Sequence, residues 1–266
     1  MKLKNKIVIV TGAAGGIGEA LVGELLEKGN IVLGVDISED RLHKLKSNIV
    51  DDNLYTYVCD LTQIESVKSL SVDIIKTHGH VDCLINNAGM IQPFIKVSTI
   101  DYSYIEKVMK VNFYSALYMS KTFIPYLLER DEAHILNVSS MGGCFPVAGQ
   151  VIYGASKAAL KLLSEGLASE LSETNINVSV ALPGAMDTNI KKNSYGDTTD
   201  HEQDKENSHM KVLSPEKAAS KLLKVIEKNK LISYIGKDSK IMNLLYKLNP
   251  KFAPKIMYSA VKTRLQ

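Results

Sequence analysis

The sequence of 266 residues has few cysteines and no long apolar run. Its cysteines, Cys59, Cys83 and Cys144, are odd in number and share no metal-ligand spacing, which argues against a disulfide scaffold or a metal site. No stretch reaches the roughly 18 consecutive apolar residues of a transmembrane helix, and the first apolar run covers only Ile7 to Val10. We therefore expect a reduced, cytoplasmic protein without a bound metal.

The sequence also has little net charge, but this mean hides an asymmetry. Its 32 Lys and Arg exceed its 29 Asp and Glu by only three, which does not indicate a nucleic-acid-binding protein. Residues 205–266 hold 14 basic against 4 acidic residues, so residues 1–204 carry a net charge of −7. With 45% hydrophobic and 23% charged residues, the chain is too apolar for a disordered protein and typical of a globular one.

Short apolar runs alternate with helix-length amphipathic segments along the chain. The predicted strands are Ile7–Val10, Ile31–Val35, Tyr55–Val58, Val81–Ile85, His134–Val138, Ile176–Leu182 and Leu231–Ile235. The predicted helices cover 16–28, 39–48, 63–78, 99–129, 151–173 and 214–229. This alternation predicts an α/β fold, a doubly wound parallel sheet with helices on both faces.

We find no internal repeat and no Pro- or Ser-rich linker, so we expect one domain over residues 1–236. Within it, residues 189–212 are polar and are expected to form a loop near the substrate. Residues 237–266 follow as a basic amphipathic extension with two short helices. Two helix starts carry capping signals, Thr62-x-x-Glu65 and Ser214-Pro215.

The first predicted strand runs directly into a glycine-rich turn, which a predicted helix follows. The turn reads Thr-Gly-Ala-Ala-Gly-Gly-Ile-Gly over residues 11–18. Glycine lets the backbone approach a pyrophosphate, and the helix N-terminus offers free N–H groups and the positive end of its dipole. Because the turn lies between strand and helix at the start of an alternating chain, it predicts a dinucleotide site rather than a tight turn that binds nothing.

Asp36 ends the second predicted strand, 18 residues after Gly18. Its carboxylate can accept hydrogen bonds from the adenosine ribose hydroxyls and would repel a 2′-phosphate. No Lys or Arg lies within residues 12–18, and Ile37 follows the aspartate, so nothing nearby is placed to neutralise such a phosphate. The pattern favours NAD over NADP, with an ordinary loop aspartate as the alternative.

Tyr153 and Lys157 are four residues apart at the start of the predicted helix 151–173, which puts the phenol and the ammonium on one helix face. A nearby ammonium favours the phenolate and lowers the tyrosine pKa, which suits proton transfer near neutral pH. A strand-end hydroxyl at Ser139 or Ser140 can face the same cleft. Tyr-x3-Lys alone is more typical of an ordinary amphipathic helix, but its combination with this serine and a nucleotide fold favours catalysis.

Residues 4–236 resemble a short-chain dehydrogenase/reductase. The matching features occur in the family's order: Thr-Gly-x3-Gly-x-Gly at 11–18, Asp36, Asp60, Asn-Asn-Ala-Gly at 86–89, Asn112, Ser140, Tyr-x3-Lys at 153–157, and Pro183-Gly184 with Thr188. Ser140 stands 13 residues before Tyr153, as in the family, which favours it over Ser139. The resemblance implies a Rossmann fold and an NAD-dependent oxidoreductase that acts on a hydroxyl/carbonyl pair.

The resemblance also implies four catalytic residues. Tyr153 would exchange a proton with the substrate oxygen, Ser140 would hydrogen-bond that oxygen, and Lys157 would hold the nicotinamide ribose and lower the Tyr153 pKa. Asn112 would position a water on a proton route, or would simply bend or cap its helix. The implied cofactor-binding residues are Gly12, Gly15, Gly16, Ile17, Gly18, Asp36, Ile37, Asp60, Leu61, Asn87, Ala88, Gly89, Tyr153, Lys157, Pro183, Gly184, Met186 and Thr188.

The substrate is expected to meet a mostly apolar wall formed by Met90, Ile91, residues 141–147, Gln150 and residues 185–186. Such a wall favours a small, moderately hydrophobic ketone or secondary alcohol over a sugar. The substrate-contacting residues that we expect are Ser140, Gly142, Cys144, Gln150 and Tyr153.

The basic segment 237–266 holds 7 basic residues and 1 acidic residue, and three interpretations remain open. Its lysines can be solvated on helices that pack on the body or in an oligomer interface, which we favour. Its helices can lie on an anionic membrane surface as a peripheral contact. Nucleic-acid binding has no motif to support it.

Three functions are compared on this basis: an NAD-dependent oxidoreductase, a membrane-associated enzyme of lipid-like substrates, and a non-catalytic dinucleotide-binding regulator. The complete set of Ser140, Tyr153 and Lys157 argues against the regulator. The resemblance implies a homodimer or homotetramer that pairs through the helices predicted at 99–129 and 151–173.

Overall fold

The computed structural model describes residues 1–185, 194, 213–262 and 265. Within this part, seven parallel strands form one sheet in the order β3-β2-β1-β4-β5-β6-β7. The strands are β1 (Ile7–Thr11), β2 (Ile31–Asp36), β3 (Leu54–Val58), β4 (Cys83–Asn86), β5 (Ala133–Val138), β6 (Ile176–Pro183) and β7 (Ile232–Ile235). Each predicted strand is present, with either end shifted by at most two residues. The fold is the predicted Rossmann-like α/β fold.

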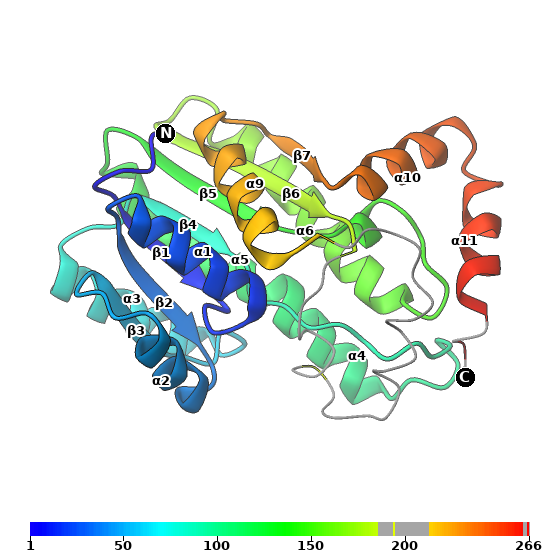
Figure 1. Cartoon of the computed structure of the whole chain (residues 1–266), viewed down its shortest axis with the longest axis horizontal. Helices are drawn as coiled ribbons and strands as arrows, with labels where there is room; N and C mark the ends of the chain where they lie inside the picture. Colours follow the sequence, from blue (N-terminus) through cyan, green and yellow to red (C-terminus); the bar gives the residue numbers. More distant parts are fainter. Residues whose placement is uncertain (186–193, 195–212, 263–264, 266) are drawn as a thin grey trace.

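Helices cover both faces of the sheet (Figure 1). They are α1 (Gly16–Glu27), α2 (Glu39–Asn48), α3 (Ile64–His78), α4 (Tyr102–Met109), α5 (Ser115–Leu128), α6 (Val151–Glu170), α9 (Pro215–Glu227), α10 (Lys237–Leu248) and α11 (Ala253–Val261). Because the strands are parallel, their carboxyl ends lie at the same end of the sheet. The segments that follow β1, β2, β4, β5 and β6 therefore lie together at this end.

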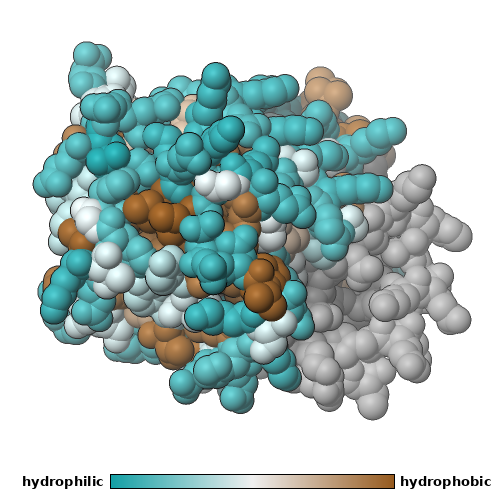
Figure 2. Space-filling view, turned by 60° about the vertical axis from the view of Figure 1, so that its left-hand side comes forward, coloured by the Kyte–Doolittle hydropathy of each residue, from teal (hydrophilic) through white to brown (hydrophobic). Residues whose placement is uncertain are grey.

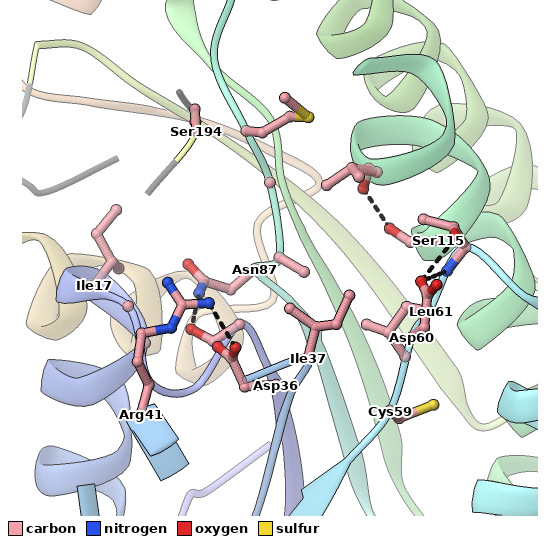
Figure 3. A pocket seen from close by; sticks show the side chains of 18 of the residues that line it. Ile17, Asp36, Ile37, Arg41, Cys59, Asp60, Leu61, Asn87, Ser115 and Ser194 are labelled. Atoms are coloured by element: carbon pink, nitrogen blue, oxygen red, sulfur yellow. Dashed lines mark hydrogen bonds and ion pairs between the residues drawn. The ribbon is translucent and has the colours of Figure 1, made fainter. Parts of the chain in front are cut away.

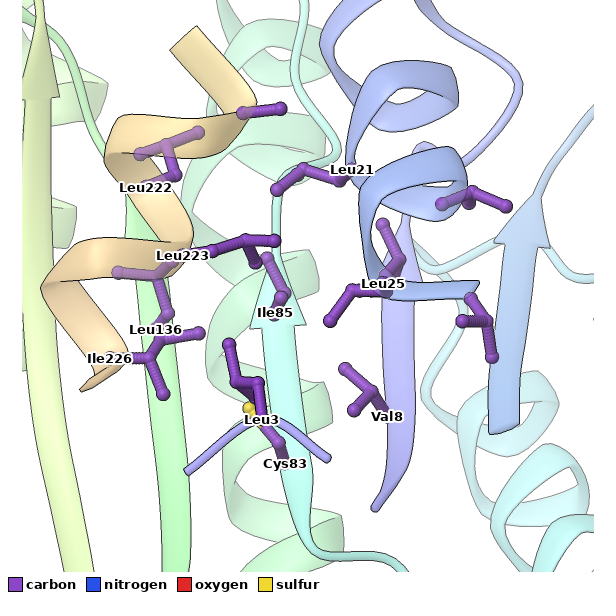
Figure 4. Close-up of a cluster of buried hydrophobic side chains, with 14 of the residues drawn as sticks. Leu3, Val8, Leu21, Leu25, Cys83, Ile85, Leu136, Leu222, Leu223 and Ile226 are labelled. Carbon is purple, nitrogen blue, oxygen red and sulfur yellow. The ribbon is translucent and has the colours of Figure 1, made fainter. Parts of the chain in front are cut away.

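Two hydrophobic clusters, one on each face, hold the helices to the sheet. Leu21 and Leu25 of α1 pack with Leu222 and Ile226 of α9 over alternate residues of the central strands, such as Ile85 (Figure 4). The other face of the sheet carries α3, α5 and α6, and its cluster includes Ile74, Met119, Phe123 and Ile135. Strand residues alternate between the clusters because successive side chains of a strand point to opposite faces.

The helix predicted over 99–129 is interrupted by one π-helical turn. The turn covers Lys110–Tyr114 and lies between α4 and α5, with the fully buried Asn112 at its centre. Such single turns occur inside α-helices and are frequent at functional sites. The long helix predicted here is therefore three consecutive elements, with Asn112 in the π-helical one.

One capping prediction is confirmed and the other is wrong. The Ser214 hydroxyl accepts from Lys217 N at the start of α9, as Ser214-Pro215 predicts. At α3 the N-cap is Gln63 rather than Thr62, and no side chain caps the helix. The Thr62 hydroxyl instead donates to Asp60 Oδ1 over 2.7 Å, so the preceding loop takes the group that a capping box would use.

The helices α10 and α11 follow β7 and lie beside the carboxyl end of the sheet (Figure 1). The Ser239 hydroxyl donates to Leu182 O, and Asp238 Oδ2 accepts from Ala185 N over 2.7 Å. The Tyr246 and Phe145 rings meet edge to face, with centroids 5.6 Å apart. The first turn of α10 is therefore anchored to the end of β6.

No helix in the described part of the chain is long and apolar enough to cross a membrane. On the side of the molecule that Figure 2 brings forward, hydrophilic residues predominate and hydrophobic residues form separate small patches. Scattered patches of this kind are ordinary for a protein surface.

Candidate active site

The glycine-rich turn after β1 forms a tight cradle at the start of α1. Gly12 has φ +63°, and a Cβ on it would lie 2.9 Å from Ala88 Cα, so a larger residue would be strained and would clash. A Cβ on Gly18 would collide with the Gly12 carbonyl. The helix begins after Gly15 without a side-chain cap, so its first N–H groups are available to an anion.

Two strand ends are tied together behind this turn. The Thr11 hydroxyl accepts from the backbone N–H groups of Asn87 and Ala88, each over 3.0 Å, and Asn87 Nδ2 donates to Thr11 O over 3.0 Å. The Asn-Asn-Ala-Gly segment after β4 therefore fixes the glycine-rich turn in place, because the Asn87 side chain hydrogen-bonds the backbone at the end of β1.

A cavity of about 310 Å³ opens at this edge of the sheet (Figure 3). Its lining includes twelve residues that sequence analysis assigned to cofactor binding: Gly12, Gly15, Gly16, Ile17, Gly18, Asp36, Ile37, Asp60, Leu61, Asn87, Ala88 and Gly89. It also includes residues that were not assigned to the cofactor: Arg41, Cys59, Thr62, Met90, Lys107, Val111, Ser115 and Ser194. Tyr153, Lys157, Pro183 and Gly184 do not line it, and Met186 and Thr188 lie outside the described residues.

Arg41 corrects the expectation that no basic residue stands near Asp36. From the first turn of α2 its guanidinium reaches back to Asp36 Oδ1 over 2.8 Å, as Figure 3 shows. Asp36 is buried and also accepts from Ala14 N over 3.3 Å and Ser38 N over 3.1 Å. Arg41 Nε has no hydrogen-bond partner in the described structure. The Arg41 guanidinium therefore lines the cavity next to the Asp36 carboxylate. Its positive charge weakens the repulsion between Asp36 and a 2′-phosphate.

Asp60 is held by its own loop. Its Oδ1 accepts from Thr62 N over 2.9 Å and from the Thr62 hydroxyl over 2.7 Å. The local turn fixes the carboxylate at the cavity wall beside Leu61.

Ser140, Tyr153 and Lys157 come together where β5 ends and α6 begins. The Ser140 side chain hydrogen-bonds Tyr153, and it also accepts from Gly142 N over 3.1 Å. Lys157 is 4% exposed, and its Nζ donates to Val138 O over 3.0 Å. A Cβ on Gly89 would lie 3.1 Å from Lys157 Nζ, so the ammonium stands directly behind a residue of the cavity wall. The site therefore continues from the cavity toward the phenol.

Burial changes the pKa of both groups, and for Tyr153 the direction is opposite to the expected one. Desolvation raises the pKa of Tyr153 above its usual 10.0, and the hydrogen bond from Ser140 opposes this only in part. Desolvation lowers the pKa of Lys157 to about 8. The Lys157 ammonium itself is directed to a backbone carbonyl at the end of β5.

Asn112 connects the loop after β4 to α6. Its Oδ1 accepts from Met90 N over 2.8 Å, and its Nδ2 donates to Met90 O over 2.9 Å and to Ser156 Oγ over 3.0 Å. The Ser156 hydroxyl in turn donates to Tyr153 O over 2.7 Å. The π-helical turn thus places a fully buried amide that fixes the carbonyl side of the Tyr153 backbone.

Gln92 fixes the other side of the same residue, and sequence analysis missed it. The Gln92 side chain is fully buried, and its Oε1 accepts from Tyr153 N over 2.8 Å. Its Nε2 donates to Gly149 O over 2.9 Å, while Gln150 Nε2 donates to Gln92 O over 2.7 Å. The amide therefore caps the N-terminus of α6, which has no side-chain cap of its own.

The residues expected to contact substrate lie in differing surroundings. Gly142 stands against the Tyr153 ring, since a Cβ on it would be 3.4 Å from that ring. Cys144 is half-buried, its thiol donates to Met141 O, and burial raises its pKa. Gln150 is 5% exposed and its amide is directed to Gln92 O. The loop predicted over 189–212 lies outside the described residues except for Ser194, whose Oγ accepts from Ile91 N.

Pro183 and Gly184 end β6 beside the anchored turn of α10. Gly184 N donates to Ile235 O over 2.9 Å, and a Cβ on Gly184 would collide with the Asp238 carboxylate. Only glycine leaves room for Asp238 there.

These groups fit a dinucleotide. The cradle at Gly12 admits backbone but no side chain, the N–H groups at the start of α1 suit a pyrophosphate, and the Asp36 carboxylate suits ribose hydroxyls. Lys157 supplies a positive charge close to the far end of the cavity at Gly89. No group of three or more His, Cys, Asp or Glu residues in the described part could hold a metal ion.

Comparison with known proteins agrees with this arrangement. The family model "short chain dehydrogenase" matches residues 6–199. An uncharacterized oxidoreductase of Staphylococcus aureus is 32% identical over 188 residues, which are 71% of this chain and 81% of that protein. The solved structure of a closed serine dehydrogenase complexed with NADP+ has a TM-score of 0.79 and 26% identity, with 86% of this chain and 94% of that chain covered.

A solved short chain dehydrogenase/reductase from Burkholderia phymatum, in complex with NAD, has the same fold. Its TM-score is 0.84 at 18% identity, with 95% of this chain and 96% of that chain covered. The matched residues 6–199 are more than half of the chain and include the glycine-rich turn, Ser140, Tyr153 and Lys157. The chain therefore belongs to the short-chain dehydrogenase family of nicotinamide-dependent oxidoreductases.

Proposed function

We propose that this chain transfers a hydride between NAD(H) and the hydroxyl/carbonyl group of a small, moderately hydrophobic secondary alcohol or ketone. The observation that carries the proposal is the hydrogen bond between Ser140 and Tyr153, together with the Lys157 ammonium, which lies directly behind the cavity wall at Gly89. The site then offers a proton donor, a hydrogen-bond donor for an oxyanion and a fixed cation.

In the reducing direction, the Tyr153 hydroxyl donates its proton to the substrate oxygen. The Ser140 hydroxyl donates a hydrogen bond to that oxygen and stabilises the negative charge that develops on it. NADH, when bound, would supply the hydride that the carbonyl carbon accepts. Lys157 stabilises the tyrosinate that remains and holds the ribose hydroxyls of the cofactor.

The raised pKa of Tyr153 keeps the phenol protonated at neutral pH, which suits a proton donor. In the oxidising direction the same group must lose its proton, so the positive charge of Lys157 and of the oxidised cofactor has to lower its pKa. We propose that Asn112 also serves the proton route between Lys157 and solvent, beside its hydrogen bonds to Met90 and Ser156.

The preference for NAD is supported by the Asp36 carboxylate at the end of β2, where the adenosine ribose would lie. Arg41 moderates this preference because it partly neutralises the same carboxylate. We therefore propose NAD as the better cofactor, with NADP accepted less well.

The substrate class is supported by the mostly apolar residues around the catalytic group. Met90, in the loop after β4, and Phe145, in the segment after β5, are both buried. Gly142 lies against the ring of Tyr153 and has no side chain of its own. Such a wall offers few partners for the hydroxyls of a sugar. If only sugars or polyols were turned over in a screen, this substrate assignment would be wrong.

The proposal is tested with Tyr153→Phe, which removes one hydroxyl and keeps the ring. We expect kcat with alcohols or ketones to fall about 10²- to 10⁴-fold, because the proton donor is lost. The dissociation constant of NADH, measured by fluorescence titration, should stay within about threefold of the wild-type value, since the cavity is unchanged. Undiminished turnover in this variant would contradict the mechanism.

A non-catalytic dinucleotide-binding regulator is the second candidate. It would bind NADH as tightly as the enzyme but show no turnover of any alcohol or ketone in the wild-type chain. The contact between Ser140 and Tyr153 favours the enzyme, because a binding protein has no need of a proton-transfer pair.

We propose in addition a homo-oligomer that pairs through α4, α5 and α6. These helices expose the large hydrophobic side chains of Tyr102, Val151 and Leu162, and the π-helical turn between α4 and α5 exposes Tyr114. Size-exclusion chromatography with light scattering would give the mass, and Leu162→Glu should then reduce it toward that of a monomer.

A further inference from the structure

The outer face of α10 carries an apolar stripe, Ile241, Leu244, Leu245 and Leu248, at helical spacings of three and four. These four side chains are 57, 57, 39 and 74% exposed. The opposite face is the one that packs on the body, through Ser239 and Tyr246. A helix on the surface of a globular protein normally buries its apolar stripe, so the orientation of α10 indicates a partner for this face.

The segment that follows α10 also exposes large hydrophobic side chains. Phe252, in the turn before α11, is 58% exposed, and Tyr258 on α11 is 52% exposed. Figure 1 shows α10 and α11 together at one end of the molecule, apart from α1, α2 and α3. Both helices at this end of the molecule therefore expose apolar side chains.

Lysines accompany this apolar surface, and they are exposed. They are Lys237, Lys240, Lys247, Lys251, Lys255 and Lys262. The one acidic residue of this stretch, Asp238, accepts from Ala185 N and faces the end of β6. Exposed apolar side chains framed by lysines are typical of helices that lie in a bilayer interface with anionic headgroups.

The charge argues against a second copy of this face as the partner. A twofold contact between two such surfaces would bring the lysines of both copies together, and their repulsion would oppose the contact. The charge of residues 1–204, −7, also orients the molecule, because an anionic surface attracts the lysine face and repels the rest.

We propose that α10 and α11 bind the surface of anionic membranes, with the α10 stripe in the interface and the lysines at the headgroups. The helices lie on the membrane and do not cross it, in keeping with their lengths of 12 and 9 residues. This inference does not depend on the proposed reaction. Tyr246, on the opposite face of α10, keeps its contact with the buried Phe145.

The experiment is co-sedimentation of the full chain with vesicles of phosphatidylcholine alone or mixed with phosphatidylglycerol. The wild type should pellet with the anionic vesicles, weakly with neutral ones, and less as salt is raised. Two double variants, Leu244→Glu/Leu248→Glu and Lys240→Glu/Lys247→Glu, should each lower the partition coefficient at least about tenfold.

Matched controls separate this site from general charge and hydrophobicity. Lys44→Glu/Lys46→Glu makes the same change in net charge on α2, and Val50→Glu/Val72→Glu alters two exposed apolar residues elsewhere. Both should pellet like the wild type at physiological salt. Circular dichroism shows that each variant is folded before it is tested.

Three outcomes would overturn the proposal. The wild type could fail to pellet with anionic vesicles, the control variants could lose binding as much as the α10 variants, or the α10 variants could pellet like the wild type. A wild type that fails to pellet, while Leu244→Glu/Leu248→Glu lowers the mass measured by light scattering, would assign the α10 stripe to a second copy instead.

Discussion

Lys157 is a buried ammonium group whose charge costs the fold free energy. Burial lowers its pKa from 10.5 to about 8. Below pH 8 the native state must carry the desolvated charge, which costs about 3 kcal/mol for a shift of this size. Between about pH 8 and pH 10.5 the unfolded state binds more protons than the native state, so the stability of the protein rises with pH in this interval.

We predict that Lys157→Met abolishes turnover and raises the free energy of unfolding at pH 7 by about 1 to 3 kcal/mol. The gain is smaller than the full cost of the charge, because Val138 O loses its partner. Urea denaturation at pH 7 and pH 10 checks this, and the advantage of the variant should shrink toward pH 10. A variant less stable than the wild type at pH 7 would contradict the burial argument.

The pairing of Asp36 with Arg41 leads to a second prediction at the scale of the residue. Asp36→Asn removes the charge that repels a 2′-phosphate and releases the Arg41 guanidinium, which lines the cavity. We expect the ratio of kcat/KM for NADP to that for NAD to rise about 10- to 100-fold.

The double variant Asp36→Asn/Arg41→Leu is the control for this prediction. It keeps the neutral side chain at position 36 but offers no cation, so most of the gain for NADP should be lost. If the double variant used NADP as well as Asp36→Asn does, Arg41 would have no part in the choice of cofactor.

Arg41 also shows a limit of sequence analysis at this scale. Neither residues 12–18 nor Ile37 offers a cation, but the first turn of α2 brings the Arg41 side chain, five residues after Asp36 in the sequence, back to the Asp36 carboxylate. The twelve cavity residues predicted from the motifs could be found because they follow strand ends, and parallel strand ends share one edge.

At the scale of the element, the start of α6 is held on both sides of Tyr153. Gln92 Oε1 accepts from the Tyr153 N–H, and the Ser156 hydroxyl donates to the Tyr153 carbonyl. Asn112 Nδ2 in turn donates to the Ser156 hydroxyl. Both sets of hydrogen bonds depend on the loop after β4. Gln92 belongs to this loop, and Asn112 is hydrogen-bonded to Met90 of the same loop. The segment that follows Asn87–Gly89 at the cavity wall therefore also positions the helix that carries Tyr153.

We predict that Gln92→Leu lowers kcat about 10- to 100-fold and leaves the dissociation constant of NADH unchanged. The buried N–H of Tyr153 would lose its acceptor, and the helix start would shift by enough to misplace the phenol. Gln92→Glu keeps an acceptor oxygen and should restore part of kcat, with the acidic group raising the pH at which Tyr153 titrates.

A core variant separates positioning from stability here. Leu70→Ala lies in the cluster under α3, away from Tyr153, and should lose about 2 kcal/mol or more without loss of kcat below its melting range. Equal losses of kcat in Leu70→Ala and Gln92→Leu would show that Gln92 acts only through stability.

The elements themselves were largely predictable, and their exceptions have local causes. Periodicity and β-branched runs located the strands, because a parallel sheet buried on both faces needs continuous apolar runs. The helix expected from residue 99 begins at Tyr102, after Asp101. The π-helical turn at 110–114 could not be derived, since it depends on the contacts of Asn112 with Met90 and Ser156. Gln92 was out of reach for the same reason, because its partner Tyr153 lies 61 positions away.

At the scale of the whole molecule, the sheet separates two hydrophobic clusters. Ile226 belongs to the cluster under α1 and α9, and Ile74 belongs to the one under α3 and α5. We predict that Ile226→Val and Ile74→Val each lower the free energy of unfolding by about 0.5 to 1.5 kcal/mol. Because the sites share no partners, the double variant should equal the sum within about 0.5 kcal/mol in urea denaturation. A larger deviation would mean that the sheet transmits strain between its faces.

The strand order has a consequence for how the chain is made. Because β1 lies inside the sheet and β2 and β3 extend it in one direction, the first strands synthesised already form one complete flank. That flank carries the glycine-rich turn and Asp36, whereas Tyr153 and the lysine-rich helices belong to segments synthesised later. Since N-terminal parts fold first during translation, a nascent chain can assemble its adenosine-binding half before its proton donor exists. The order of synthesis is thus also the order in which the two halves of the candidate site can form.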